Sequence, residues 1–336
     1  MTLRIGILST ARIARTFVAN VAPSKLVHVT AVASRDARKA EAFARELGIP
    51  KHHGSYEALL QDPEVDAVYN PLPNSLHAEW SIRATQAKKH VLCEKPLASS
   101  VTEAVAMFES ARQNCVHLAE GYPYRAQPHS LKLRELLAAG TIGTVNLVQS
   151  SFGFTMSDST NIRLNAALGG GALLDGGAYP ISLVRMVANA RPARVMAVAQ
   201  WMAGGVDRAV AATYEFQSGL VAQISCSFSQ EPHRQALIVG TQGAIQTTYM
   251  NHAPPKGPAI LLIKRGGGWT TDYEPLEVPA GNGFFAEAES FARLVQAGAG
   301  GWTGVTPEES IDIMMMIEGA LLSARSGRPV DLESLL

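Results

Sequence analysis

A carboxylate, an ammonium group and a proline stand in immediate succession at Glu94, Lys95 and Pro96, directly after the largely apolar segment His90–Cys93. A lysine at the end of a buried strand can hold a substrate hydroxyl group and stabilise the alkoxide that forms as hydride leaves. The adjacent carboxylate can orient the ammonium group, and proline fixes the backbone beside it. This order of residue types indicates chemistry at a hydroxyl-bearing carbon. A solvent-exposed Glu–Lys pair at a strand end is the structural alternative.

The elements that must position Lys95 are predicted by the first 120 residues, in which strand-like and helix-like segments alternate. Repeated strand–helix units whose strands are apolar without alternation predict a parallel sheet covered by helices on both faces. Ligands bind outside the carboxyl ends of the strands in such sheets. We therefore expect Glu94 and Lys95 to project into a cofactor crevice at the end of a later strand.

The second half of the chain changes from this alternation to a run of strands followed by two helices. Gly-containing turns separate segments that include 144–154, 193–202, 208–216, 220–228, 235–249, 259–267 and 268–279. Such a run indicates an open, mostly antiparallel or mixed sheet. The predicted fold is α/β, with a doubly wound Rossmann domain over 1–121 and an α/β domain for substrate binding and oligomerisation over 122–336.

Composition and charge exclude several classes of function. Lys plus Arg and Asp plus Glu both number 29, so a neutral chain without basic runs predicts no binding to nucleic acid or anionic membranes. The three cysteines form no C-x-x-C pair, and His52 and His53 lack partners at ligand spacing, so no metal site is expected. No signal-peptide pattern or membrane-length apolar run occurs, and a cytoplasmic protein is expected.

The segment between the first strand and the first helix is a candidate phosphate loop. The usual dinucleotide fingerprint has glycines for the tight turn and for close approach to the pyrophosphate. Gly6 is present, but Ser9 and Ala11 stand where glycines are commonest, so an ordinary turn is the alternative. Its place in a strand–helix–strand series favours nucleotide binding. The residues expected to contact the cofactor here are Gly6, Ser9, Thr10, Ala11, Arg12 and Ile13.

The end of the second strand bears on the choice of nicotinamide cofactor. An NAD-specific site carries Asp or Glu there, whereas Ser34 and Arg35 occupy these positions, with Arg38 one turn on. A guanidinium group can bind the 2′-phosphate of NADP bidentately, and Asp36 is expected to cap the next helix. We predict NADP rather than NAD. The alternative is that both arginines are solvated residues at a helix start.

Three segments resemble the signatures of the Gfo/Idh/MocA oxidoreductase family, in the same order and spacing. They are EKP at Glu94–Pro96, PLPNSLH at Pro71–His77 and GGGALLDGGAYP at Gly169–Pro180. The resemblance covers essentially the whole chain. It implies a Rossmann domain that carries NAD(P) and a C-terminal domain whose open sheet lies against a partner subunit. It also implies a cis Lys95–Pro96 peptide bond and a substrate-binding role for Asp175.

The position four residues after Asp175 is His in many members of the family, whereas here it is Tyr179. This departure resembles the branch of glucose–fructose oxidoreductase, dihydrodiol dehydrogenase and NADP-dependent xylose dehydrogenase, in which the tyrosine is taken as proton acceptor or donor. A free phenol has a pKa of about 10, and a nearby ammonium group lowers it. Tyr179 beside Lys95 can thus take the hydroxyl proton while nicotinamide C4 takes the hydride. Simple packing near a helix start is the alternative for the tyrosine.

The same resemblance assigns further residues. Pro71, Asn74, His77 and Glu94 are expected at the cofactor, with a helix-surface position as the alternative for His77. Arg125 and Arg163 are expected at the substrate. Ala126 and Gln127 depart from the family after Arg125, and a surface role is the alternative for Arg163.

Together these patterns predict an NADP-dependent oxidoreductase that acts on a sugar or polyol hydroxyl, with an aldopyranose at C1 as the first expectation. A homodimer or homotetramer through the C-terminal sheet is expected. One alternative is a trans-dihydrodiol dehydrogenase or a keto-sugar reductase. Another is a non-catalytic NADP-binding sensor, which the presence of both Lys95 and Tyr179 argues against.

Overall fold

The computed structural model describes residues 2–247, 257–266 and 268–336, and these divide into two compact units. Unit 1 comprises the described residues of Met1–Ala98, Thr102–Ala126 and Asn282–Pro307. Unit 2 comprises those of Ser99–Val101, Gln127–Gly281 and Glu308–Leu336.

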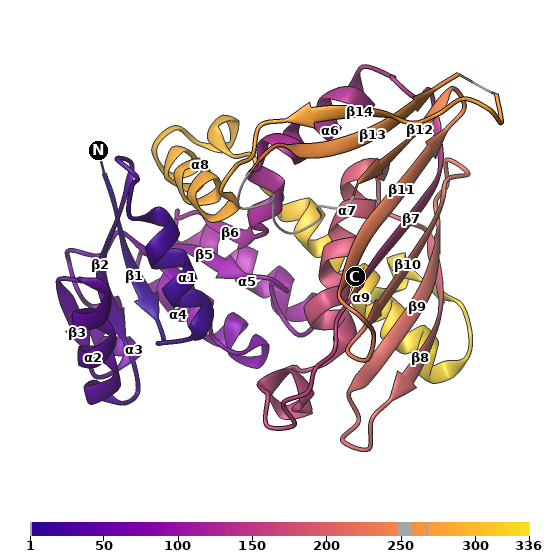
Figure 1. Ribbon diagram of the computed structural model, residues 1–336. Coiled ribbons are helices and arrows are strands. Elements are labelled where there is room, and N and C mark those ends of the chain that lie inside the picture. The colour runs from indigo at the N-terminus through magenta and orange to yellow at the C-terminus, as the bar shows by residue number, and fades with distance from the viewer. Residues whose placement is uncertain (1, 248–256, 267) are drawn as a thin grey trace. The chain divides into compact units, whose positions relative to one another are not determined.

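Unit 1 is built on a six-stranded sheet in the order β3-β2-β1-β4-β5-β6 (Figure 1). All neighbouring pairs are parallel, and the strand order reverses between β1 and β4, which makes this a doubly wound sheet as predicted. The strands are β1 (Leu3–Leu8), β2 (Val27–Ala33), β3 (Lys51–His53), β4 (Ala67–Asn70), β5 (His90–Glu94) and β6 (Leu118–Gly121).

The helices associated with this sheet contribute apolar side chains to its faces. One core cluster includes Ile5 and Ile7 of β1, Phe17 of α1, and Phe284 and Phe291 of α8, all of them buried. The helices are α1 (Arg12–Val21), α2 (Ala37–Leu47), α3 (Tyr56–Leu60), α4 (His77–Gln86), α5 (Val101–Gln113) and α8 (Gly283–Ala297).

The segment Asn282–Pro307 joins unit 1 although it lies near the far end of the chain. The sequence prediction assigns all of 122–336 to the second domain. Helix α8 nevertheless belongs to the core of unit 1, where Phe284 meets Phe17 edge-on with ring centroids 6.4 Å apart. An amphipathic pattern shows that one face of a helix is buried, but it does not show which core receives that face.

Unit 2 is built on a nine-stranded sheet in the order β14-β13-β12-β11-β7-β10-β9-β8-β15. Only β7 and β10 pair in parallel among the described strands of this sheet, so the mostly antiparallel sheet is confirmed. The segment predicted over 235–249 forms β11 and β12, and residues 248, 249 and 267 of the predicted strands lie outside the described residues. The strands are β7 (Val145–Gly153), β8 (Arg194–Trp201), β9 (Asp207–Glu215), β10 (Val221–Ser227), β11 (His233–Gly240), β12 (Gly243–Thr247), β13 (Ala259–Arg265), β14 (Glu274–Val278) and β15 (Val330–Asp331).

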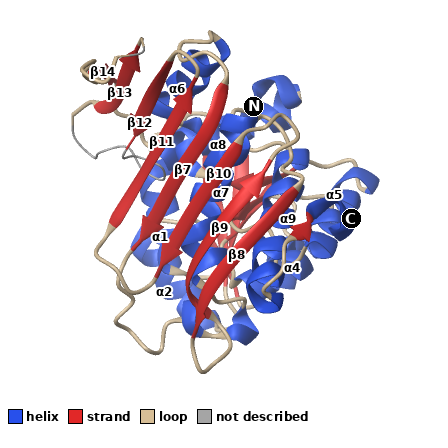
Figure 2. Ribbon diagram, turned by 90° about the vertical axis from the view of Figure 1, so that its right-hand side faces the viewer, coloured by secondary structure: helices blue, strands red, loops and turns tan. Residues whose placement is uncertain are grey.

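Three long helices cover one face of this sheet: α6 (Pro128–Ala138), α7 (Ala178–Ala188) and α9 (Pro307–Ser326). The Tyr214 hydroxyl of β9, for example, donates to the Met316 carbonyl of α9 at 3.0 Å. Figure 2 looks onto the opposite face, where no helix among the described residues lies in front of the strands. An antiparallel sheet can leave one face open in this way.

The C-terminal part of α7 is tied to α9 by a buried ion network. Asp312 of α9 is fully buried, and its two oxygens accept from Arg185 Nε at 2.7 Å and from Arg191 Nε at 2.5 Å. A buried carboxylate is stable only when it is paired, so both guanidinium groups hold this end of α7 in place. The opposite end of α7 carries Tyr179.

Shorter elements lie in the connections. They are η1 (Asn74–Leu76), η2 (Pro123–Ala126), η3 (Ile162–Leu164), η4 (Ala166–Leu168), the π-helical turn η5 (Leu173–Gly177), η6 (Ala299–Gly301) and η7 (Leu332–Leu335). Among all the helices of the described chain, none has the length and apolar character needed to cross a membrane.

Candidate active site

Lys95 directly follows the last residue of β5, at the carboxyl edge of the parallel sheet. The Lys95–Pro96 peptide bond is cis, as the family resemblance implies. The preceding Glu94 is buried, and the Tyr69 hydroxyl of β4 donates to Glu94 Oε1 at 2.5 Å. Tyr69 itself stacks on Phe17 with centroids 4.0 Å apart. The residue before Lys95 is thus anchored by the neighbouring strand.

The peptide group after Pro96 is held at both ends. The Leu97 N–H donates to Glu120 Oε1 at 2.9 Å, and the Pro96 carbonyl lies 2.9 Å from His77 Nδ1. Glu120 is fully buried and lies at the end of β6. The segment that carries Lys95 is therefore fixed from α4 on one side and from β6 on the other.

His77 is 1% exposed, which excludes the helix-surface alternative. Its Nε2 lies 2.8 Å from the Leu72 carbonyl, so both ring nitrogens face backbone oxygens of signature segments. Burial lowers the pKa of His77, and hydrogen bonds to the Pro96 and Leu72 carbonyls oppose that shift. The ring thus connects the loop after β4 with the loop after β5.

A third buried acid of unit 1 lies in α8. Burial raises the pKa of Glu287 well above its usual value, and the charges of Glu94 and Glu120 act in the same direction. Burial and the neighbouring acids thus favour the neutral form of the Glu287 carboxyl group. Sequence reasoning missed this residue because it is about 190 positions from Lys95 and carries no local motif.

The candidate phosphate loop has the backbone geometry of a glycine position at Ser9. Its φ angle is 104°, a region that favours glycine, and its hydroxyl accepts from the Ala11 N–H at 3.2 Å. Helix α1 then begins at Arg12 without a side-chain N-cap bond and without an acidic residue in its first turn. An uncapped helix N-terminus of this kind is suited to an anionic phosphate group.

Close packing around Gly6 leaves no room for a side chain at this position. A Cβ atom built on Gly6 would lie 2.8 Å from Leu59 Cδ2 and 3.0 Å from Val65 Cγ1. Its glycine character therefore lets β1 lie close to α3, which is one of the uses of glycine in nucleotide-binding folds.

The end of β2 presents arginine instead of a carboxylate. Arg35 is exposed and forms a side-chain hydrogen bond with Tyr56, whose phenol is otherwise buried. Burial raises the pKa of Tyr56, and the Arg35 charge opposes that shift. Asp36 accepts from the Arg38 and Lys39 N–H groups and caps α2, which confirms that prediction. The end of β2 thus presents guanidinium groups, and the carboxylate of Asp36 is engaged as a helix cap.

In unit 2 the structure brings two predicted substrate residues together. Arg163 Nε lies 2.7 Å from Asp175 Oδ2, and the side chains are 44% and 15% exposed. The ion pair gives the carboxylate of Asp175 a defined direction. Arg163 is thus an exposed residue whose guanidinium group pairs with Asp175.

The backbone that presents Asp175 depends on two neighbouring constraints. Asp207 is 3% exposed, and its Oδ2 accepts from the Leu173 N–H at 2.6 Å, which anchors the start of η5. Gly171 has a φ angle of 137°, and an added Cβ would meet the Asp207 carboxylate. The π-helical turn then offsets Asp175 before α7 begins, a feature frequent at functional sites.

Tyr179 is the second residue of α7, and its ring stacks on Phe152 of β7 with centroids 5.4 Å apart and planes at 21°. Phe152 also meets Phe154 edge-on at 6.0 Å, and Phe154 lies 5.3 Å from Phe228. This aromatic cluster beside Tyr179 was not predicted. Phe152 lies in β7 and Phe154 follows the end of that strand, and their two-residue spacing is a signal that they share a face.

The remaining predicted residues are placed as follows. Lys95 lies in unit 1, whereas Asp175, Tyr179 and Arg163 lie in unit 2. Arg125 lies in η2 of unit 1 and is 1% exposed, among the buried tyrosines of the same segment. Within the described ranges, no group of three or more His, Cys, Asp or Glu side chains is arranged to hold a metal ion.

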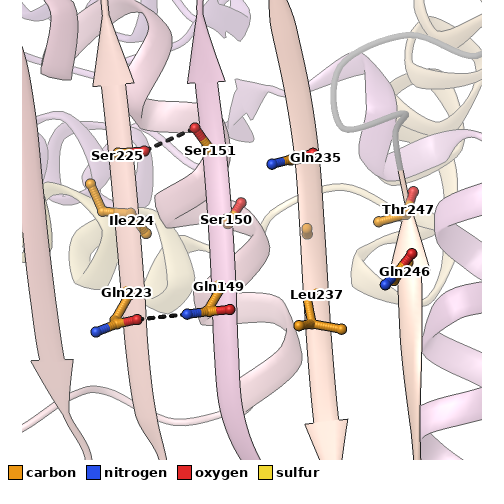
Figure 3. A pocket seen from close by; sticks show the side chains of 11 residues that line it. Gln149, Ser150, Ser151, Gln223, Ile224, Ser225, Gln235, Leu237, Gln246 and Thr247 are labelled. Carbon is orange, nitrogen blue, oxygen red and sulfur yellow. Dashed lines mark hydrogen bonds between the residues drawn. The ribbon is translucent and has the colours of Figure 1, made fainter.

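The nine-stranded sheet also carries a depression of about 550 Å³ (Figure 3). Two cross-strand pairs lie on it: Gln149 Nε2 donates to Gln223 Oε1 at 2.9 Å, and the Ser151 and Ser225 hydroxyls are 2.8 Å apart. None of the predicted catalytic or cofactor residues lines it. Its lining residues are Gln149, Ser150, Ser151, Gln223, Ile224, Ser225, Gln235, Ala236, Leu237, Gln246 and Thr247.

Comparison with known families gives two matches that together span most of the chain. Residues 3–122 match the oxidoreductase family with an NAD-binding Rossmann fold, and residues 130–246 match the GFO/IDH/MocA C-terminal domain.

Individual relatives match over nearly the full length. The chain is 36% identical to D-xylose 1-dehydrogenase (NADP(+)) 2 of Haloferax volcanii, covering 98% of this chain and 100% of the relative. It is also 36% identical to trans-1,2-dihydrobenzene-1,2-diol dehydrogenase of Danio rerio, covering 89% and 90%. A solved 3-ketoreductase from Actinomadura kijaniata, in complex with NADP and TDP-benzene, matches with TM-score 0.87 and 29% identity, covering 96% and 98%.

Ser9 provides a test of the loop geometry. Glycine and alanine both remove its hydroxyl, but only glycine relieves the positive φ, so Ser9→Gly should be more stable than Ser9→Ala by about 1 kcal/mol. Ser34 is the control, since it has no positive φ. There, Ser34→Gly should be less stable than Ser34→Ala. Chemical denaturation measures all four variants, and the same order at both positions would contradict the assignment.

Proposed function

Since the chain belongs to the Gfo/Idh/MocA oxidoreductase family, we propose that it is an NADP-dependent dehydrogenase that oxidises an aldopyranose at C1. The observation that carries this proposal is the set Lys95, Asp175 and Tyr179, in a chain that matches an NADP-dependent xylose dehydrogenase over 98% of its length. A non-catalytic sensor would have no use for a proton-transfer pair of this kind.

When bound, NADP would supply the hydride acceptor of the proposed reaction at its nicotinamide ring. Lys95 donates a hydrogen bond to the reacting hydroxyl oxygen and stabilises the negative charge that develops there. Tyr179 accepts the hydroxyl proton as the general base. Asp175, aimed by Arg163, accepts a hydrogen bond from a neighbouring sugar hydroxyl.

The surroundings of Tyr179 support a ring-shaped polyol as substrate. The carboxylate of Asp175 can bind hydroxyl groups, while the rings of Phe152 and Phe154 offer an apolar surface for the C–H face of a pyranose. The same aromatic surface favours a trans-dihydrodiol as the second candidate substrate. Both substrates undergo oxidation of a secondary or hemiacetal hydroxyl.

The preference for NADP is supported by the charge at the end of β2. Arg35 and Arg38 stand where a carboxylate would repel a 2′-phosphate, and the bond to Tyr56 limits the motion of the Arg35 guanidinium. A preoriented arginine loses less entropy on binding a phosphate group.

We also propose that the open face of the nine-stranded sheet joins two copies of the chain in a homo-oligomer. Val198 of β8 is 64% exposed and Met196 is 41% exposed. Across β9, their rows of paired residues continue through Thr213 and Ala211 to the uncharged side chains of Gln223 and Ser225 on β10. Apolar groups surrounded by neutral polar groups are typical of protein interfaces. A homodimer or a homotetramer would cover these groups.

Tyr179→Phe tests the proton-transfer role. A panel of aldoses and dihydrodiols with NADP, followed by the absorbance of reduced nicotinamide, should show turnover by the wild type and a kcat reduced at least about 100-fold in the variant. NADPH binding should be unchanged. Tyr273→Phe, also in unit 2, is the control and should keep full activity. A Tyr179→Phe enzyme with the wild-type rate would contradict the assignment.

Arg35→Ala tests the phosphate site. Loss of charge-assisted bonds should raise KM for NADP by about 10- to 100-fold and leave KM for NAD nearly unchanged. Tyr56→Phe should give a smaller change of the same kind, since it leaves the guanidinium in place. Arg45→Ala removes an exposed arginine that pairs with Glu41 on α2 and serves as control. A strong preference for NADP that persists in Arg35→Ala would overturn this argument.

A further inference from the structure

Asp207 is a buried acid of β9, and its carboxyl group lies at the start of the helical segment that carries Asp175 and Tyr179. It is 3% exposed, and its Oδ2 accepts from the Leu173 N–H at 2.6 Å. Burial raises the pKa of Asp207, and backbone hydrogen bonds from Leu173, from its own N–H group and from Ala172 oppose that shift. Two consecutive N–H groups at the start of the segment therefore meet one carboxyl group.

The cap of this segment comes from a distant strand because the residue before η5 cannot supply one. Ala172 has no side-chain oxygen and forms no side-chain cap bond. The first N–H groups of a helix have no partner within the helix, and a buried one without a partner costs stability. Asp207, which is 34 residues after Leu173, supplies the missing acceptor.

Gly171 places the backbone directly against this carboxyl group. Its φ angle is 137°, which favours glycine, and an added Cβ would meet Asp207 Oδ1. The Gly171 N–H donates to the Arg163 carbonyl at 2.9 Å, and the Gly171 carbonyl accepts from the Asp175 N–H at 3.1 Å. Arg163 Nε in turn donates to Asp175 Oδ2 at 2.7 Å. A shift of the backbone beside Asp207 would therefore move the carboxylate of Asp175.

Tyr179 is anchored by an aromatic ring and by the far end of its helix. The ring stacks on Phe152 with centroids 5.4 Å apart, and Arg185 Nε donates to the buried Asp312 at 2.7 Å. Loss of a cap frees the first turn of a helix before the later turns. Asp175 lies in that first turn, whereas Tyr179 follows in α7.

We propose that Asp207 is a positioning residue that sets the affinity for the sugar through Asp175 and has little effect on proton transfer at Tyr179. Its carboxyl group holds the start of η5, and η5 presents the carboxylate of Asp175 to a substrate hydroxyl. The effect on sugar affinity rests on the proposed function, whereas the hold on the backbone does not.

Hydrogen–deuterium exchange followed by mass spectrometry tests the hold on the backbone without substrate or turnover. Asp207→Ala should speed amide exchange about tenfold or more in peptides that cover 172–176, because two N–H groups lose their acceptor, and should leave 181–188 unchanged. Asp272→Ala changes an exposed aspartate of unit 2 and is the control, with wild-type exchange in both peptides. Wild-type exchange over 172–176 in Asp207→Ala would overturn the proposal.

Steady-state kinetics test the role with an aldose that the wild type oxidises. Asp207→Ala should raise KM for the sugar about tenfold, lower kcat by no more than about threefold and leave KM for NADP unchanged. Asp207→Asn keeps one acceptor oxygen, so its KM should lie between those of the wild type and Asp207→Ala. It also decides the case if Asp207→Ala does not fold, since a wild-type KM in Asp207→Asn would then contradict the proposal. A large fall in kcat with an unchanged KM would equally contradict it.

A double variant tests whether Asp207 acts through Asp175. In an Asp175→Ala background, Asp207→Ala should raise KM for the sugar little further, because the interaction that it positions is already lost. Two fully additive increases in KM would overturn the route through Asp175. Absence of turnover with every aldose would overturn the effect on sugar affinity together with the proposed function, and the exchange experiment would still decide whether Asp207 holds η5.

Discussion

Hydrogen bonding at both ends of one buried peptide group, Pro96–Leu97, is the interaction on which the Lys95 site depends. Its N–H is bound by a carboxyl group from β6 and its carbonyl by a ring from α4. Because buried backbone groups must be paired, the strand end cannot move without breaking one of these bonds. A lysine on a four-carbon stem gains a defined position only when its backbone is fixed in this way.

In unit 2, other polar groups fix the backbone that presents Asp175 and Tyr179. Asp207 caps the start of the π-helical turn, Gly171 makes room for it, and Arg163 directs the carboxylate of Asp175. At the far end of α7, the buried network around Asp312 keeps the helix that carries Tyr179 in place. In both units, a candidate catalytic side chain is presented by backbone that other polar groups constrain.

Much of this architecture could be predicted because it follows from local patterns. Unalternating apolar strands between helices predict the parallel sheet of unit 1, and Asp36 could be assigned as a helix cap from its type and place. The arginine at the end of β2 could be recognised from the sequence, because a guanidinium group stays charged in nearly any surroundings.

The parts that could not be predicted depend on contacts between distant segments. The sequence does not show that Phe284 packs on Phe17, that Glu287 lies among the acids of unit 1, or that Phe228 joins Phe154 beside Tyr179. The sequence also does not show which polar side chains are buried, and burial changes what such a side chain can bind. His77 reads as a polar residue at a helix start, and only the structure shows that it is buried between the Leu72 and Pro96 carbonyls.

Transfer of deuterium from a labelled sugar tests the central claim most directly. The enzyme would be given an aldose that carries deuterium at C1 together with NADP, and the reduced nicotinamide would be examined for the label. The account predicts that deuterium appears on nicotinamide C4 and that kcat falls when the hydride-transfer step is slowed by the isotope. Reduced cofactor without deuterium, or no reduction with any aldose despite tight NADP binding, would contradict it.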